Sequence, residues 1–169
     1  VDIGATNITS TLFKEEGILV RYYQNVKLIG DETTIPRQVK DLIDRSLAYT
    51  GKNPDDLRSV GISSAGPFRK IDGMIELICH NLCGGITPER GLIPNDWTSI
   101  PLEKELRRSY KDLVIENDAV AGAVAERTFG AGVGFDDLIY VTWSTGVGTG
   151  AYVDGRLIRG KNGNAPHGG

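Results

Sequence analysis

The sequence has few cysteines, no long apolar run and no excess of charge of one sign. Its two cysteines, Cys79 and Cys83, are too few for a disulfide scaffold and favour a reducing compartment, so we expect a cytoplasmic protein. No apolar run reaches the ~18–20 residues that a membrane-spanning helix needs, so no membrane is expected as a partner. The formal net charge is only −3 and no basic stripe is present, which argues against nucleic acid as a partner.

Glycine, by contrast, is abundant, with 22 residues and no collagen period or low-complexity tract to explain them. Tight turns and close approach of a ligand are the reasons we expect. One glycine run follows a short apolar stretch, as Gly146-Val147-Gly148-Thr149-Gly150-Ala151, and fits the G-x-G-x-x-G/A fingerprint of dinucleotide-binding folds.

That fingerprint requires a helix to begin inside the glycine run, and the residues that follow favour strands instead. Asp154-Gly155 is a strong hairpin signal between short apolar segments, so residues 138–158 are predicted to form an antiparallel ribbon. This argues against a Rossmann-type oxidoreductase, and the missing Gly-Lys-Ser/Thr excludes a Walker A loop. Two interpretations stay open for the loop: a nest of backbone N–H groups that binds phosphate, or a glycine-rich hairpin without a ligand.

The rest of the chain alternates between strand and helix patterns. Residues 1–13 read as strand, glycine turn and strand, and residues 18–29 continue as a third strand. Residues 33–51 show helical spacing, with apolar side chains at Val39, Leu42, Ile43 and Leu47. A strand over 57–67, a helix over 100–110, a strand over 112–118 and a helix over 119–130 complete the expected order. Residues 68–100 show little periodicity and are expected to be a functional loop or to fold around something.

Five motifs, in order, resemble the ROK family of sugar kinases, within the actin/hexokinase-like superfamily. They are Asp2-x-Gly4-x-Thr6-Asn7, "GISSAGP" (61–67), "HNL" (80–82), "ENDAVAGAVAE" (116–126) and "STGVGTG" (144–150), followed by "DGRLIRGKNGNA" (154–165). The resemblance implies an α/β fold, with an actin-like (ribonuclease H-like) lobe over residues 1–118 whose mixed sheet is flanked by helices. Residues 119–169 would then be the connecting helix and the first strands of a second, related lobe, which is incomplete.

By this resemblance the activity is ATP-dependent phosphorylation of a hexose hydroxyl, with glucose the leading substrate and Asp118 the general base. Such a reaction needs a carboxylate that orients the hydroxyl and accepts its proton. Asp118 lies where a strand ends and a helix begins, so a plain helix N-cap is the alternative; Ala121 offers no support for a capping box there.

The resemblance assigns the remaining site residues to the sugar or to Mg-ATP. Gly66, Asn81, Asn117 and His167 would line the sugar beside Asp118. Asp2 would hold Mg²⁺, through water, since Mg²⁺ keeps part of its hydration shell. An unpaired carboxylate near an apolar core would be costly, which also favours a role for Asp2. The phosphates would be bound by Gly4, Thr6, Asn7, Thr145, Gly146 and Gly148.

The chain also departs from the family pattern. The segment after "GNA" usually reads Gly-Glu-x-Gly-His, whereas here Pro166 and His167 are followed by two glycines, and Ser144 replaces the usual glycine. The cysteine-rich loop that binds structural zinc in many members is absent from these residues, and a fragment is the expectation. Dimers are common in this family, although these residues themselves demonstrate none. A sugar-sensing transcriptional regulator of the same family is the alternative function, discriminated by a helix-turn-helix upstream of Asp2.

Overall fold

The computed structural model describes residues 1–86, 91–144 and 146–165. Its largest element is a five-stranded sheet of order β3-β2-β1-β4-β7. The strands are β1 (Asp2–Ile3), β2 (Asn7–Lys14), β3 (Gly17–Asn25), β4 (Val60–Ser64) and β7 (Leu113–Asn117). The first three pair antiparallel, whereas β4 lies parallel to both β1 and β7, so the sheet is mixed as predicted.

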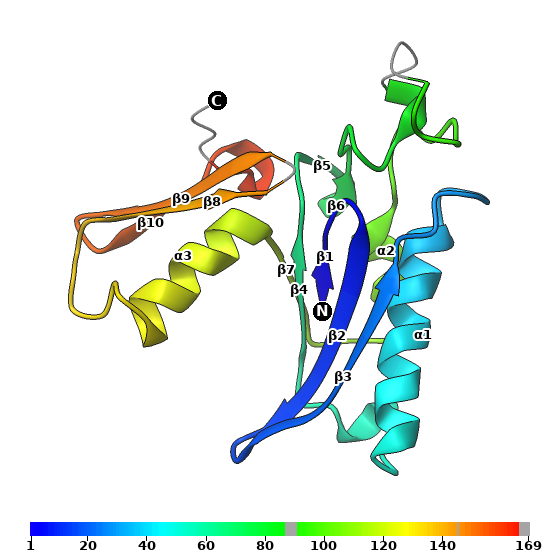
Figure 1. Cartoon of the computed structure of the whole chain (residues 1–169), viewed down its shortest axis with the longest axis horizontal. Helices are drawn as coiled ribbons and strands as arrows, with labels where there is room; N and C mark the ends of the chain where they lie inside the picture. Colours follow the sequence, from blue (N-terminus) through cyan, green and yellow to red (C-terminus); the bar gives the residue numbers. More distant parts are fainter. Residues whose placement is uncertain (87–90, 145, 166–169) are drawn as a thin grey trace.

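Helix α1 (Thr34–Tyr49) covers one face of this sheet against β2 and β3, with the short α2 (Leu102–Leu106) beside it (Figure 1). The four apolar side chains predicted at helical spacing in α1 are all buried in the core. Burial of such side chains contributes about 1.5–3 kcal/mol each. The helical prediction over 33–51 is confirmed, and Gly51 follows the helix with a φ of +66°.

The region between residues 68 and 100 contains a hairpin that the sequence analysis did not predict. Strands β5 (Phe68–Ile71) and β6 (Met74–Leu77) pair antiparallel around Asp72 and Gly73, which both have positive φ, at 50° and 79°. Asp-Gly is the dipeptide that favours such a turn, and the same signal identified the later hairpin. Short 3₁₀ helices η1 (Pro54–Asp56) and η2 (Gly84–Ile86) lie before β4 and after β6.

The second sheet is an antiparallel ribbon of order β10-β9-β8, formed by β8 (Leu138–Trp143), β9 (Val147–Val153) and β10 (Arg156–Ile158). Asp154 and Gly155 form the predicted turn, with φ of 48° and 70°. Strands and not a helix therefore follow the glycine run, which confirms the argument against a dinucleotide-binding fold. The 3₁₀ helix η4 (Lys161–Gly163) follows β10.

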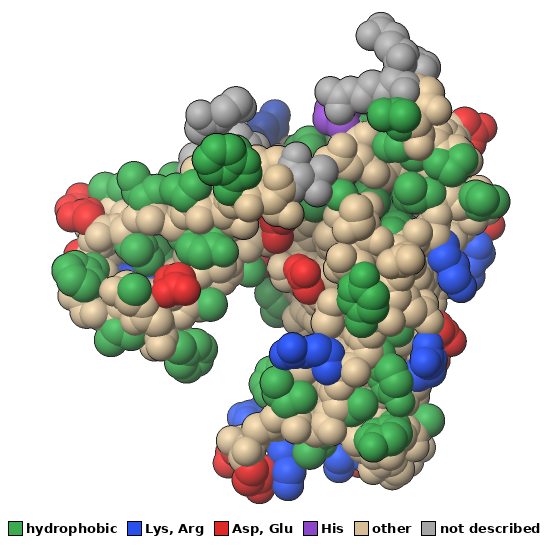
Figure 2. Space-filling view, viewed as in Figure 1, with side chains coloured by type: hydrophobic (Ala, Val, Ile, Leu, Met, Phe, Trp, Pro, Cys, Tyr) green, Lys and Arg blue, Asp and Glu red, His purple; other side chains and the backbone are tan. Residues whose placement is uncertain are grey.

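Helix α3 (Asp118–Phe129) begins directly after β7 and packs against β8 and β9. The packing is close because both elements carry glycine at the contact. A Cβ at Gly150 would lie 2.4 Å from the carbonyl oxygen of Ala119, and a Cβ at Gly122 would lie 2.5 Å from the Tyr140 ring. The opposite side of the ribbon exposes apolar side chains, among them Ile139, Val141 and Trp143 (Figure 2 shows hydrophobic side chains along this part of the molecule).

Most other predicted elements are confirmed, with shifted or shorter bounds. The third strand ends at Asn25 rather than at residue 29, and the helix predicted over 100–110 is helical only in α2. Among the described residues, no helix is both long and apolar enough to span a membrane.

Candidate active site

Three parallel strands of the first sheet end at one edge, and the predicted sugar-side residues follow these ends. In the register, Ile3 of β1 is opposite Ser64 of β4, which is opposite Asn117 of β7. The residues that continue from these strands therefore share this edge, as expected for ligand sites of open α/β sheets. Gly4, Gly66 and Asp118 each lie within two residues of such an end.

Asn117 is completely buried and caps helix α3. Its Oδ1 accepts hydrogen bonds from the backbone N–H groups of Ala119 and Val120, at 3.1 and 3.3 Å. Its Nδ2 has no hydrogen-bond partner among the described residues. A Cβ at Gly66 would lie 3.1 Å from this Nδ2, so a glycine at 66 leaves the amide its space. A buried donor without a partner is costly, which makes Nδ2 the clearest candidate to bind a ligand oxygen.

Asp118 is the first residue of α3 and is partly buried. Its Oδ1 accepts a hydrogen bond from the N–H of Ala119 at 2.8 Å. Because Asn117 occupies the N-cap, the plain-cap interpretation does not apply to Asp118. A carboxylate in the first turn is also favoured by the helix dipole.

Asn81 lies in a turn shortly after β6. Burial raises the pKa of the neighbouring Cys79 thiol, the backbone N–H of Asn81 opposes this shift, and the charge of Asp118 adds to it. Asn81 follows Cys79 by two residues and is exposed, so its predicted sugar contact stays a prediction. Cys79 and Cys83 are both buried in the hydrophobic core, and among the described residues no group of three potential ligands could hold a metal.

The first predicted phosphate loop is a tight turn between β1 and β2. The N–H of Gly4 donates to the carbonyl of Asn7 at 2.9 Å, and Asn7 Nδ2 donates to Thr6 Oγ1 at 3.2 Å. Asp2 is exposed, and its Oδ1 accepts a hydrogen bond from Ser63 Oγ at 2.9 Å. The expectation that Asp2 faces a costly apolar environment is therefore wrong, because its carboxylate points away from the core and has a hydroxyl partner.

The second predicted phosphate loop joins β8 to β9. Thr145 lies outside the described residues. The N–H of Ser144 donates to the carbonyl of Gly146 at 2.9 Å, and a Cβ at Gly146 would meet open space. Gly148 differs: a Cβ there would lie 3.0 Å from the Ala119 Cβ, so helix packing already explains this glycine. The same contact places the start of β9 next to the residue that follows Asp118.

The sequence of the whole chain, residues 1–169, matches the ROK family. The chain belongs to the ROK family. It is 30% identical to a glucokinase from Thermotoga maritima over 168 residues, covering 96% of this chain and 46% of that protein. It is also 29% identical to a xylose repressor from Caldicellulosiruptor bescii, covering 98% of this chain and 38% of the repressor. The chain thus spans less than half the length of these relatives.

Solved ROK structures share the fold. A ROK family glucokinase from Streptomyces griseus, in complex with glucose and AMPPNP, matches with a TM-score of 0.71 and 29% identity over 97% of this chain and 46% of that chain. A ROK hexokinase from Thermus thermophilus matches with a TM-score of 0.67 and 26% identity over 96% of this chain and 48% of its own. The actin-like α/β fold expected from the sequence is confirmed.

Three residues with contacts at the edge received no predicted site role. Ser63, Arg159 and Asn164 lie inside the quoted motifs but were given no site role. Ser63 contacts Asp2, Arg159 contacts Glu116 beside Asn117, and Asn164 contacts Phe68, two residues after Gly66. Their place in the quoted motifs was the available signal, whereas residue type alone, a Ser within a strand or an Asn in a glycine-rich turn, indicates no such contact. His167 lies outside the described residues, so its predicted sugar contact stays a prediction.

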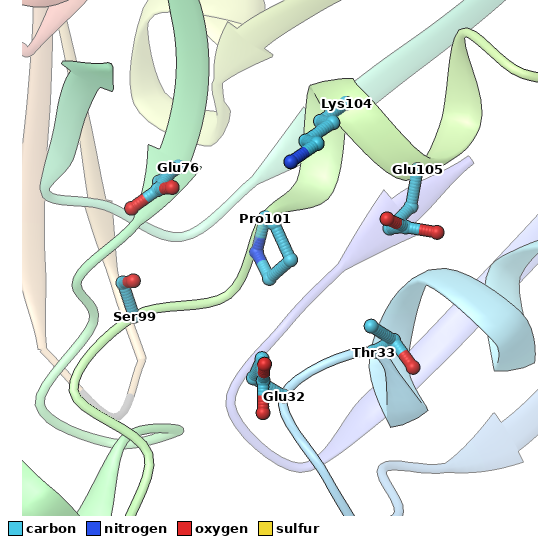
Figure 3. Close-up of a pocket in the computed structure, with 7 residues that line it drawn as sticks. All are labelled: Glu32, Thr33, Glu76, Ser99, Pro101, Lys104 and Glu105. Atoms are coloured by element: carbon cyan, nitrogen blue, oxygen red, sulfur yellow. The ribbon is translucent and has the colours of Figure 1, made fainter.

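A surface hollow of about 270 Å³ lies elsewhere, between the start of α1 and α2. Figure 3 shows its lining, in which Lys104 and Glu105 of α2 and Glu76 of β6 surround Pro101. Glu76 is paired with Arg69, and Glu105 with Arg108. None of the residues that the ROK motifs assign lines this hollow, so the sheet edge and not the hollow is the candidate site.

Proposed function

We propose that this chain carries the sugar-binding edge and both phosphate loops of an ATP-dependent hexose kinase. The observation that supports this most directly is the Asn117-Asp118 pair at the end of β7. The pair consists of a buried amide donor, which has no partner among the described residues, and a carboxylate at the start of a helix. Gly66 has no side chain and so leaves space beside the amide. Such a pair suits a sugar, which offers oxygen atoms as acceptors and hydroxyl groups as donors.

In this proposal Asp118 orients the acceptor hydroxyl and takes its proton as the phosphoryl group is transferred. Asn117 Nδ2 donates to a neighbouring sugar hydroxyl, while its Oδ1 keeps the start of α3 in place. Asn81 and Gly66 line the same side. Because the two roles of Asn117 use different atoms, sugar binding does not compete with the cap.

The phosphates of ATP would lie between the two glycine turns, at Gly4, Thr6 and Asn7 on one side and Thr145, Gly146 and Gly148 on the other. Asp2 suits Mg²⁺, since an exposed single carboxylate held by Ser63 matches a cation that is bound mainly by phosphates and water. Bound there, Mg²⁺ would neutralise charge on the phosphates. The chain's own contribution is to position ATP and the sugar and to move the proton.

Glucose is the leading substrate in this proposal, because glucokinases are among the relatives and the Streptomyces griseus structure contains glucose. The proposal places the protein in the cytoplasm, where ATP is available and where the buried cysteines stay reduced. A homodimer, which the family resemblance implies, is tested by the molecular mass of the full-length protein in solution. The division into lobes at residue 118 also belongs to the proposal.

A second candidate is a sugar-sensing transcriptional regulator without kinase activity. The observation that favours it is the similarity to the Caldicellulosiruptor bescii xylose repressor, which covers 98% of this chain at 29% identity. A sensor needs the sugar edge but no general base. Turnover therefore separates the two candidates, whereas sugar binding alone does not.

The test is Mg²⁺-dependent ADP release by the full-length encoded protein with a panel of hexoses. An Asp118→Asn variant keeps the size of the side chain and removes the base, so we expect kcat to fall about 10²–10⁴-fold with sugar binding retained. Asp112→Asn is the matched control, because Asp112 is exposed and lies just before the opposite end of β7. A wild-type protein that binds a hexose without turnover would favour the sensor, and an active Asp118→Asn variant would refute the role of Asp118.

A further inference from the structure

After β10 the chain leaves the second sheet in a short segment, residues 159–165, which contacts both β7 and β5. Arg159 pairs with Glu116 of β7, with its Nε and Nη2 at 2.9 and 2.6 Å from Glu116 Oε2. Figure 1 shows the following turn, η4, in red beside the start of β5, and the two elements are in contact. This segment therefore touches β7 of the first sheet and β5 of the separate β5–β6 hairpin, both close to the candidate site.

The second of these contacts is made by the side-chain amide of Asn164. Its Oδ1 accepts a hydrogen bond from the N–H of Phe68 at 2.6 Å, and its Nδ2 donates to the carbonyl of Phe68 at 2.8 Å. Nδ2 also donates to the carbonyl of Lys161 at 3.1 Å. The amide thus pairs with the first residue of β5 as a neighbouring strand would, and both of its ends are engaged.

The turn that presents Asn164 is unusually constrained. Asn162 and Gly163 have φ of 65° and 85°, and the N–H of Gly160 donates to the carbonyl of Asn164 at 2.8 Å. A non-glycine residue at positive φ is uncommon and costs energy that other contacts must offset. The turn therefore holds the backbone of Asn164 in place and directs its amide toward Phe68.

The residues before Phe68 are held against the candidate site. The N–H of Ala65 donates to the carbonyl of Ile3 at 3.0 Å, and the carbonyl of Pro67 accepts from the N–H of Ile78 at 2.9 Å. Between these anchors, a Cβ at Gly66 would lie 3.1 Å from Asn117 Nδ2 and 3.7 Å from Asn164 Oδ1. The space beside the buried Asn117 amide is consequently set by the 65–68 segment, and Asn164 fixes the end of that segment.

We propose that Asn164 is a positioning residue for the sugar site: it anchors Phe68, holds Gly66 beside Asn117 and thereby sets the affinity for the hexose. This inference rests on the proposed function, because it assigns the hexose to that edge. Asn164 itself need not touch the sugar, since its amide is already hydrogen-bonded to backbone. Loss of the amide would leave both polar groups of Phe68 without that partner and would release the segment.

The experiment measures the Kd for glucose and the other hexoses by titration calorimetry without ATP, using full-length protein. We expect Asn164→Ala to weaken binding about 10-fold, the effect of losing a net hydrogen-bond contribution at the site. Asn164→Asp is the second variant, because its carboxylate can accept from Phe68 N–H but cannot donate to the Phe68 carbonyl. Its second carboxylate oxygen would face the carbonyl oxygens of Phe68 and Lys161 and be repelled by them, so this variant should bind the hexose no better than Asn164→Ala.

A matched control removes other side-chain-to-backbone hydrogen bonds far from the edge. Arg107 donates to the carbonyls of Lys111 and Leu113 at the opposite end of β7 and also pairs with Glu103, so Arg107→Ala tests general destabilisation. Thermal unfolding of all variants shows whether each is folded at the temperature of the titration. We expect Arg107→Ala to lower the stability and to leave the Kd unchanged.

The outcomes separate this inference from the proposed function. If the wild-type protein binds no hexose, the proposed function fails and the inference with it. If the wild-type protein binds and folded Asn164→Ala binds equally well, only the role of Asn164 is refuted. Equal weakening by Arg107→Ala and Asn164→Ala would also overturn it, since the effect would then follow stability and not position.

Discussion

The glycines of the β8–β9 region predict a graded response to alanine. A new Cβ would meet nothing within 4 Å at Gly146, the Ala119 Cβ at 3.0 Å at Gly148, and the Ala119 carbonyl oxygen at 2.4 Å at Gly150. The first position has room for a methyl group. At the last position, α3 or β9 must move by about 1 Å to restore the ordinary contact distance of 3.4 Å.

These distances set the expected free energies of unfolding. Forcing an extra methyl group into a packed contact costs about 1–3 kcal/mol. Replacing glycine by alanine where it fits gains about 0.4–1 kcal/mol, because the unfolded chain loses freedom. We therefore expect Gly146→Ala to be neutral or slightly stabilising, Gly148→Ala to be intermediate, and Gly150→Ala to destabilise by about 2 kcal/mol.

Urea unfolding of the full-length variants, followed by circular dichroism, measures the series. The m-value should stay constant, so that a change in the midpoint reports stability. Equal midpoints for Gly146→Ala and Gly150→Ala would refute the packing argument. In the kinase assay, the phosphate-loop proposal further expects Gly146→Ala to raise the KM for ATP while leaving the stability intact.

Three other predictions concern buried polar groups. Tyr110 Oη is buried without a partner among the described residues, so Tyr110→Phe should raise the free energy of unfolding by up to about 1 kcal/mol in urea titrations. A lower free energy of unfolding in this variant would show that the hydroxyl has a hydrogen-bond partner and would refute the prediction. Burial raises the pKa of the Cys83 thiol from 9.0 to about 12, so its contribution to stability is full below pH 9.0 and is lost as the pH rises to about 12. As the pH rises between those two values, the urea midpoint of unfolding should fall less for Cys83→Ala than for the wild-type protein. An equal fall of the midpoint with pH in both proteins would contradict this. Asn117→Ser should retain the helix cap, whereas Asn117→Ala should lose about 1 kcal/mol of stability. Both variants should bind the hexose more weakly in calorimetry. Unchanged affinity in either variant would refute the role of Nδ2 in the sugar site.

Local preferences determined much of the fold from the sequence alone. The Asp154-Gly155 turn and helix α1 follow from conformational propensities and spacing that act within a few residues. The order of the strands, with Asn117 and Asp118 at the end of the strand predicted over 112–118, also placed these site candidates at a strand end. The β5–β6 hairpin carried the same Asp-Gly signal and could have been predicted from it.

Only the tertiary structure decided what each edge residue contacts. It made Asn117 the helix cap, turned Asp2 outward to Ser63, and assigned Gly150 to the contact with α3. It also joined Asn164 to Phe68 across 96 residues of sequence. No local pattern encodes such a contact, because it depends on how two sheets and the helix between them pack. The sequence by itself therefore determined most of the elements and the place of Asn117 and Asp118 at a strand end. Packing decided which glycine makes room for a helix and which amide remains for a ligand.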